Sequence, residues 1–205
     1  MADMKINPEL VAVVGDLVAS RGSARKATHS ALMDALETLP TGVVPLAPTV
    51  GDEIQGVFAT LAESIKATHL LRLHMLSHGS DIRFGIGTGY IEEIGDGIQD
   101  GSAWWNARMA LEQVEELAGT SGWSGIRTGI NDDDPRLAPS LHLIDAALSK
   151  LKPGAAGTLL GLVTDESNQE TAAALGISPS ANSQRIQSND LRPLAAAMTA
   201  HWPEA

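Results

Sequence analysis

One segment divides the chain into two parts with different patterns. Asn131-Asp132-Asp133-Asp134-Pro135 joins four turn-forming polar residues to a proline, and such a segment breaks helices and strands. Before it, short apolar runs alternate with stretches of helical periodicity, whereas after it only helical periodicity is found. We therefore expect an α/β domain over residues 1–132 and a small all-α domain over residues 136–205.

The elements of the first part follow from apolar periodicity and from the positions of glycine and proline. Strands are predicted at 9–17, 43–47, 54–59, 81–90 and 122–130, and helices at 24–39, 61–76 and 101–117. This order predicts an α+β sandwich of the ferredoxin-like or palm type, with helices on one face of a mostly antiparallel sheet. Pro45 and Pro48 indicate that the second strand lies at an edge or bulge.

The composition excludes several kinds of site. The 205 residues include no cysteine, which rules out disulfides, thiolate zinc sites, iron–sulfur clusters and a cysteine nucleophile, and favours the cytoplasm. We expect no signal peptide, because the first residues are not a basic region followed by a long apolar run. We expect no membrane partner, because no apolar stretch approaches the roughly 18 to 20 residues of a membrane span. The net charge of −11 opposes nucleic acid as the main partner of the whole chain.

Two acidic turns are the strongest functional candidates. Asp16 and Asp52 each follow a glycine at the end of an apolar run or turn, where backbone is exposed and a ligand can approach. If the two strands are neighbours, both carboxylates point at one spot and can bind Mg²⁺ or Mn²⁺, with Glu53 as a third ligand. The alternative is that both aspartates are turn or cap residues and that Glu53 is solvated.

A nucleotide bound to this metal would contact the residues around the two turns. Backbone amides before a helix suit phosphate oxygens, an arginine adds a charged contact, and glycine lets the backbone approach closely. Gln55 either reads a base or braces the hairpin. The predicted nucleotide contacts are Leu17, Val18, Ala19, Ser20, Arg21, Gly51 and Gln55.

Glycines and tryptophans mark the next strand and helix. Gly85, Gly87 and Gly89 alternate, so they lie on one face of their strand. Such a face leaves room for a nucleotide or for a closely packed helix, and we favour the helix. Trp104 and Trp105 begin the following helix, where one is expected in the core and the other at the rim.

Several of these segments resemble the SatD family and, more distantly, class III nucleotidyl cyclases and diguanylate cyclases. The resemblance lies in VVGDLVASR (13–21), VGDEIQG (50–56), IRFGIGTG (82–89) and DGSA (100–103), and for SatD it extends through the C-terminal part. It implies a palm-like fold. In the cyclases, the positions that match Asp16 and Asp52 hold two metal ions.

The cyclase resemblance does not carry over the catalytic pair of the helix. Class III cyclases have an asparagine four residues after the glycine that starts this helix and an arginine four residues further. Counted from Gly101, these positions are Trp105 and Met109, while Asn106 and Arg108 stand one residue away, or about 100° around the helix. Charge stabilisation of the transferring phosphate is most of such catalysis, so the sequence leaves enzymatic activity open.

The second part contains a predicted helix-turn-helix at 168–187. Gly176 forms the turn and Ser178 caps the second helix. Thr171 and Asn182 stand where aliphatic core residues are usual, and a buried amide needs a partner. With five Lys/Arg against six Asp/Glu from residue 136 onward, a packing or dimerisation module is the alternative to DNA binding. The predicted DNA contacts are Ser180, Ser183, Gln184 and Arg185.

These features predict a bacterial regulatory protein with a metal–nucleotide site and a DNA-contacting helical part. The expected partners are a nucleoside triphosphate or another nucleotide with Mg²⁺ or Mn²⁺, DNA, and a second copy of the chain. Two alternatives remain open. One is an enzyme of nucleotide chemistry, by cyclase-like phosphoryl transfer or by hydrolysis, and the other is an interaction module without a ligand.

Overall fold

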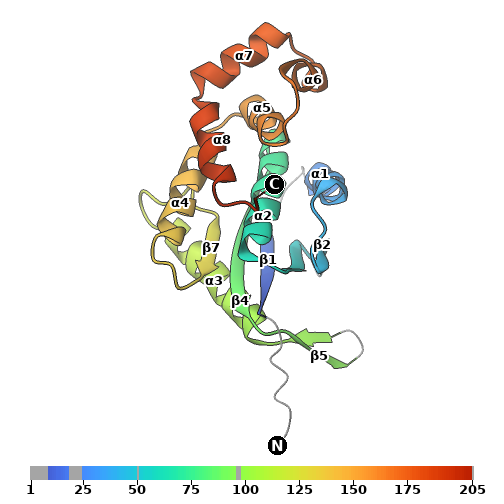
Figure 1. Cartoon of the computed structure of the whole chain (residues 1–205), viewed down its shortest axis with the longest axis vertical. Helices are drawn as coiled ribbons and strands as arrows, with labels where there is room; N and C mark the ends of the chain where they lie inside the picture. Colours follow the sequence, from blue (N-terminus) through green and yellow to red (C-terminus); the bar gives the residue numbers. More distant parts are fainter. Residues whose placement is uncertain (1–8, 19–24, 50, 96–97, 205) are drawn as a thin grey trace, which may run out of the picture.

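The computed structural model describes residues 9–18, 25–49, 51–95 and 98–204, and Figure 1 shows how its elements are arranged. The strands are β1 (Leu10–Val18), β2 (Val44–Pro48), β3 (Glu53–Phe58), β4 (Asp81–Gly89), β5 (Glu92–Gly95), β6 (Ile98–Asp100) and β7 (Thr128–Asn131). The helices are α1 (Arg25–Thr38), α2 (Leu61–Ser77), α3 (Ser102–Ala118), α4 (Leu137–Leu148), α5 (Pro153–Val163), α6 (Asn168–Ala174), α7 (Pro179–Ser188) and α8 (Leu191–Thr199). The fold is α+β, as predicted. Within the described ranges, no helix combines the length and the apolar character needed to cross a bilayer.

Five of the described strands form one mixed sheet in the order β2-β3-β1-β4-β7. Neighbours are antiparallel except β4 and β7, which are parallel. Strand β2 lies at the edge and its register with β3 shifts between Val44 and Ala47, so both effects expected of its prolines are present. The last strand is shorter than predicted, because the residues before it form turns in which Ile126 N–H donates to Trp123 O.

The sequence patterns do not predict the small sheet formed by β5 and β6. These two strands pair as an antiparallel hairpin between β4 and α3. All residues of β5 are exposed, so no alternation of apolar and polar side chains marks it as a strand. Figure 1 shows the hairpin projecting from one end of the sheet, at the end of the molecule away from α5 to α8.

Helices cover both faces of the large sheet, so the prediction of helices on one face is wrong. In β1, Val11 and Val13 belong to an apolar cluster with buried side chains of α1 and α2. Ala12 and Val14 belong to a second cluster, with side chains of α3. Successive side chains of a strand point to opposite faces, so a strand that is apolar at every position needs cover on both.

Helix α3 approaches β4 and β7 very closely through glycines. A Cβ at Gly85 would collide with the backbone oxygen of Ala107, and a Cβ at Gly87 with the backbone nitrogen of the same residue. In β7, a Cβ at Gly129 would collide with the backbone oxygen of Ala110. The alternating glycines therefore serve close helix packing and leave no space for a nucleotide beside them.

Replacing Gly87 by alanine is expected to destabilise the protein by about 1–3 kcal/mol or more, because the added methyl group meets helix backbone that cannot move aside. Urea unfolding followed by circular dichroism measures this change. Gly119→Ala is the matched control, because Gly119 has a helical φ of −74° at an exposed helix end. An unfolding midpoint of Gly87→Ala equal to that of the wild type would contradict the close packing.

The helices that follow β7 pack on the same core as the sheet. The apolar cluster that contains α1 and α2 also contains buried residues of α4, α5 and α8, among them Leu148 and Met198. The predicted boundary at 132–136 falls between β7 and α4. The parts 1–132 and 136–205 thus share one apolar core, and their division into two domains stays a prediction.

A buried carboxylate joins α4 to α2 and to the sheet. Asp145 is 0% exposed and accepts a hydrogen bond from the guanidinium of Arg72, which is 1% exposed. It also accepts the backbone N–H groups of Arg127 and Thr128, at 2.8 and 2.7 Å. The second carboxylate on Arg72 is Asp81, whose Oδ1 accepts from Nε at 2.9 Å. Each buried charge therefore has an opposite charge and further hydrogen bonds.

Asp145→Asn is expected to lower the free energy of unfolding by about 3 kcal/mol or more, because the amide leaves the buried Arg72 with less compensation and turns an N–H towards backbone donors. Urea unfolding at neutral pH measures the loss. The control is Asp134→Asn, since the ion pair of Asp134 with Arg136 is exposed and should contribute nothing measurable. Equal unfolding midpoints for the two variants would overturn this role of Asp145.

Candidate functional site

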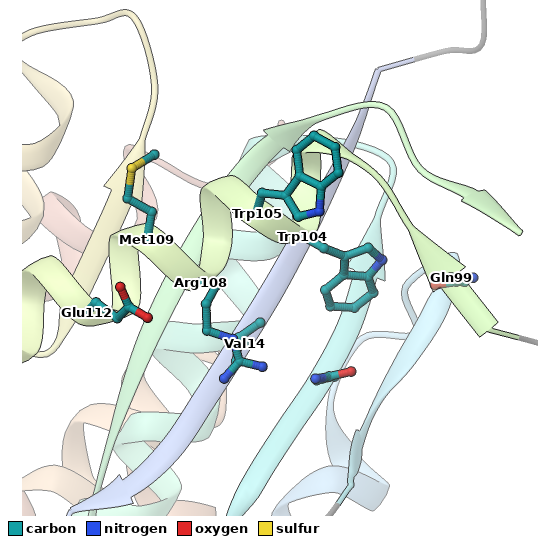
Figure 2. Close-up of a pocket in the computed structure, with 8 residues that line it drawn as sticks. Val14, Gln99, Trp104, Trp105, Arg108, Met109 and Glu112 are labelled. Atoms are coloured by element: carbon teal, nitrogen blue, oxygen red, sulfur yellow. The ribbon is translucent and has the colours of Figure 1, made fainter. Parts of the chain in front are cut away.

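A cavity of about 680 Å³ lies beside α3, where the sheet continues past the helix towards β3. Helix α3 itself packs on β4, β7 and β1. Cavities of this size with a mixed apolar and polar lining commonly hold small organic ligands. The lining, most of which Figure 2 labels, consists of Val14 and Gln55 of the sheet, Gln99 of β6, and Trp104, Trp105, Arg108, Met109 and Glu112 of α3.

Two indoles form the aromatic part of this wall. Trp105 is 57% exposed, and its Nε1 donates to Asp100 Oδ1 at 3.0 Å. Tyr90 meets it edge-on, with the ring centroids 6.3 Å apart. Trp104 packs partly buried against the α3 cluster, and its buried Nε1 has no hydrogen-bond partner among the described residues. Trp105 lies at the rim, as predicted, whereas Trp104 is only partly buried and packs against the core while lining the cavity.

Asp16, a predicted metal ligand, is paired with an arginine on the same face of the sheet. The antiparallel register places it opposite Glu53 of β3 and Arg83 of β4, so the three side chains form one row. Arg83 donates from Nε and Nη2 to the two carboxylate oxygens of Asp16, at 3.0 and 2.9 Å. This bidentate bond raises the pKa of Arg83 and occupies both oxygens of Asp16.

Glu53 is paired with Arg108 in the same way. Nη1 and Nη2 of Arg108 donate to its two oxygens at 2.5 and 3.1 Å, and Gln55 Nε2 donates to Oε1 at 2.8 Å. The bond from Arg108 lowers the pKa of Glu53 below its usual value. The Arg108 side chain is still 46% exposed and lines the cavity. Gln55 both braces the strand and lines the cavity.

Asp52 borders a different cavity. It follows Gly51, which has a φ of 81°, in the turn between β2 and β3. This second cavity has a volume of about 250 Å³ and lies against α1, with Leu17, Gly51 and Glu53 also on its wall. Of the other predicted nucleotide contacts, Val18 ends β1 half-buried, Gln55 lines the first cavity, and Ala19, Ser20 and Arg21 lie outside the described residues.

Two of the three predicted metal ligands, Asp16 and Glu53, already accept hydrogen bonds from arginines. Both oxygens of Asp16 and both oxygens of Glu53 accept guanidinium N–H groups. Within the residues that the structure describes, no group of three or more His, Cys, Asp or Glu side chains is placed to hold a metal ion. Coordination requires several oxygens turned to one point. Mg²⁺ or Mn²⁺ binding at Asp16, Asp52 and Glu53 stays a prediction.

The family match covers nearly the whole chain. The SatD family model matches residues 10–195, from the start of β1 into α8. The chain belongs to the SatD family. The resemblance inferred from the sequence motifs is thereby confirmed for SatD. No curated protein matches the chain.

In this SatD protein, the two residues nearest to the cyclase catalytic pair are engaged in other contacts. Asn106 Nδ2 donates to Thr88 O at 2.8 Å and so fastens α3 to β4. Arg108 is held by Glu53. Trp105 and Met109, which stand in the cyclase register, line the cavity. An indole and a thioether cannot stabilise the charge of phosphoryl transfer, so the wall suits binding better than this reaction.

Sequence reasoning missed most of the cavity of this SatD protein. Gln99 and Glu112 carry no sequence signal of their own. The sequence predicts one core and one rim tryptophan but does not place either beside a cavity. One pattern does point to the site. Trp105, Arg108 and Glu112 follow one another at helical spacings of three and four residues, which predicts a shared face of the helix.

The predicted DNA contacts of the SatD chain lie on α7 but are not equally accessible. Ser180 and Gln184 are exposed, and Ser183 is half-buried. Arg185 donates from Nη1 to Gly154 O of α5 at 3.3 Å. Arg185 is half-buried, and its contact with DNA stays a prediction.

The local chemistry around α6 and α7 agrees with the sequence. Ser178 Oγ accepts a backbone N–H of the first turn of α7, and Gly176 has a φ of 64°. Asn182 is 1% exposed, as its position predicts. Its Oδ1 accepts from Thr158 Oγ1 at 2.7 Å and its Nδ2 donates to Asn168 Oδ1 at 2.9 Å. These bonds offset the cost of burying the amide.

Proposed function

We propose that this SatD protein is a regulatory protein that binds a nucleotide in the cavity beside α3 and contacts DNA through its helical part. One observation carries the proposal. The exposed indole of Trp105 and the accessible guanidinium of Arg108 lie on one wall of one cavity. An indole face stacks on any base, and a guanidinium binds phosphate in a bidentate manner.

The spacing of these groups suits a nucleotide. Trp105 and Arg108 are three residues apart, so they stand about 4.5 Å apart along the helix axis and on the same side. The amides of Gln55 and Gln99 each offer a donor and an acceptor to a base edge. Binding requires Arg108 to exchange the carboxylate of Glu53 for a phosphate, and both anions accept the same fork of N–H groups.

We also infer a palm-like α/β part and a helix-turn-helix. The SatD and cyclase resemblance supports the first, together with β1 between antiparallel β3 and β4 at the centre of the sheet. The second is supported by α6 and α7, which are joined by residues 175–178. This connection contains Gly176, which has a left-handed backbone conformation, and Ser178, which caps α7. Both assignments agree with a ligand-binding part joined to a DNA-reading part.

Isothermal titration calorimetry with AMP, GMP, ATP and GTP, with and without Mn²⁺, tests nucleotide binding. We expect Arg108→Gln to weaken the tightest of these ligands about 10-fold or more, because a charged hydrogen bond contributes about 1.5–3 kcal/mol. Arg136→Gln is the matched control, since Arg136 is an exposed arginine outside the cavity. Absence of heat with all four nucleotides would contradict nucleotide binding by this cavity.

The stacking contact has its own matched pair. Trp105→Leu should weaken binding by about 1–3 kcal/mol, the usual loss when a base stack is removed. Trp123→Leu removes an indole of 43% exposure elsewhere on the surface and should leave the affinity unchanged. Chromatography of the same mixtures after incubation separates binding from turnover.

DNA binding is tested by selection from a random duplex pool at low salt. We expect an enriched sequence that loses binding in Ser180→Glu and Gln184→Glu, because a carboxylate on the exposed face of α7 repels phosphates. Gln113→Glu is the control, since it adds the same charge to an exposed position of α3. A selection without enrichment would favour the packing or dimerisation role of α6 and α7.

A further inference from the structure

We propose that the cavity beside α3 selects a nucleotide with a single phosphate group and binds it without a metal ion. This inference rests on the nucleotide binding proposed above and names the class of nucleotide. It follows from the charges that the structure places around the cavity, from the partners that hold them, and from the side chains that are accessible to a ligand.

Negative charge exceeds positive charge at this wall. Among the described residues that line the cavity, Arg108 is the one cation and Glu112 the one anion. Glu53 adds a second carboxylate through its bidentate bond to Arg108. Asp100 adds a third, through its bond to the Trp105 indole. A ligand can therefore bring little negative charge beyond what one guanidinium can bind.

The nearest further arginine of this row is not available. Arg83 donates to both oxygens of Asp16, and its Nη2 also donates to Glu115 at 3.2 Å. Its side chain is only 13% exposed. Turning Arg83 to a phosphate would leave two carboxylates without their cation, which is unfavourable near a partly buried site. Among the described residues at this wall, one arginine is therefore left for one phosphate.

When Arg108 turns to a phosphate, its former partner Glu53 keeps another hydrogen bond. Gln55 Nε2 donates to Glu53 at 2.8 Å independently of the arginine, so the carboxylate keeps a hydrogen bond when the guanidinium turns to a ligand. A second or third phosphate has no such provision. It would meet Glu112 and the released Glu53, and a Mg²⁺ ion to neutralise it finds Asp16 still bound to Arg83 and Glu53 still hydrogen-bonded to Gln55.

A series of ligands with the same base but increasing charge tests the selectivity. The probes are adenosine, adenosine 3′,5′-cyclic monophosphate, AMP and ATP, each titrated calorimetrically into the full chain in EDTA, and then ATP with Mg²⁺. The guanine series is run in parallel. We expect a ligand with one phosphate to bind at least 10-fold more tightly than both the nucleoside and the triphosphate. This binding should occur in EDTA, because it needs no metal ion.

The outcomes separate this inference from the function on which it rests. ATP with Mg²⁺ binding more tightly than AMP would overturn the single-phosphate selectivity and leave nucleotide binding intact. Equal affinity for adenosine and AMP would overturn phosphate recognition by Arg108. Absence of binding throughout both series would overturn the proposed function and this inference together.

A charge variant tests the electrostatic cause. Glu112→Gln removes a carboxylate from the wall and should narrow the affinity ratio between AMP and ATP at least threefold, because ATP gains more from its removal. Glu116→Gln is the matched control, one turn further along α3 and exposed outside the cavity. An unchanged ratio in Glu112→Gln would overturn the charge argument.

Discussion

Helix α3 lies against β4 and β7 at a distance that only glycine permits. Gly85, Gly87 and Gly129 remove the side-chain layer that normally separates a helix from a sheet. Because the helix is so close, Arg108 in its middle contacts Glu53 of β3, which lies two strands away from β4. The indoles of Trp104 and Trp105 project from the same helix beside the cavity (Figure 2). The cavity and the Arg108–Glu53 pair depend on that contact.

The charges of the protein are arranged in two ways that differ in exposure. Arg72 and Asp145 are fully buried and satisfied by several partners, so they join elements and cannot be exchanged. Arg108 and Glu53 form a similar pair, but both remain partly exposed at the rim of a cavity. A pair that is formed but accessible can give up one partner to an anion of the same shape. This difference distinguishes a structural ion pair from a candidate binding site.

The helical part is in direct contact with the elements that carry the cavity. Strand β7 packs on α3 through Gly129, and the next residue back, Thr128, donates its backbone N–H to Asp145 of α4. The apolar core continues from α2 into α4, α5 and α8. Helices α6 and α7 pack on α5, and α5 packs on α2, which covers the face of the sheet opposite to α3.

Local periodicity and turn chemistry in the sequence alone determined the order of most elements, the edge position of β2, the cap and turn of α6–α7, and the family. These features depend on residues close together in the chain, so they can be predicted without knowledge of packing. Only the tertiary structure decided that helices cover both faces, that Asp16 and Glu53 meet arginines, and that Asp52 borders another cavity. Strand register and helix rotation are set by contacts between distant segments, and a shift of one residue turns a side chain to the opposite face.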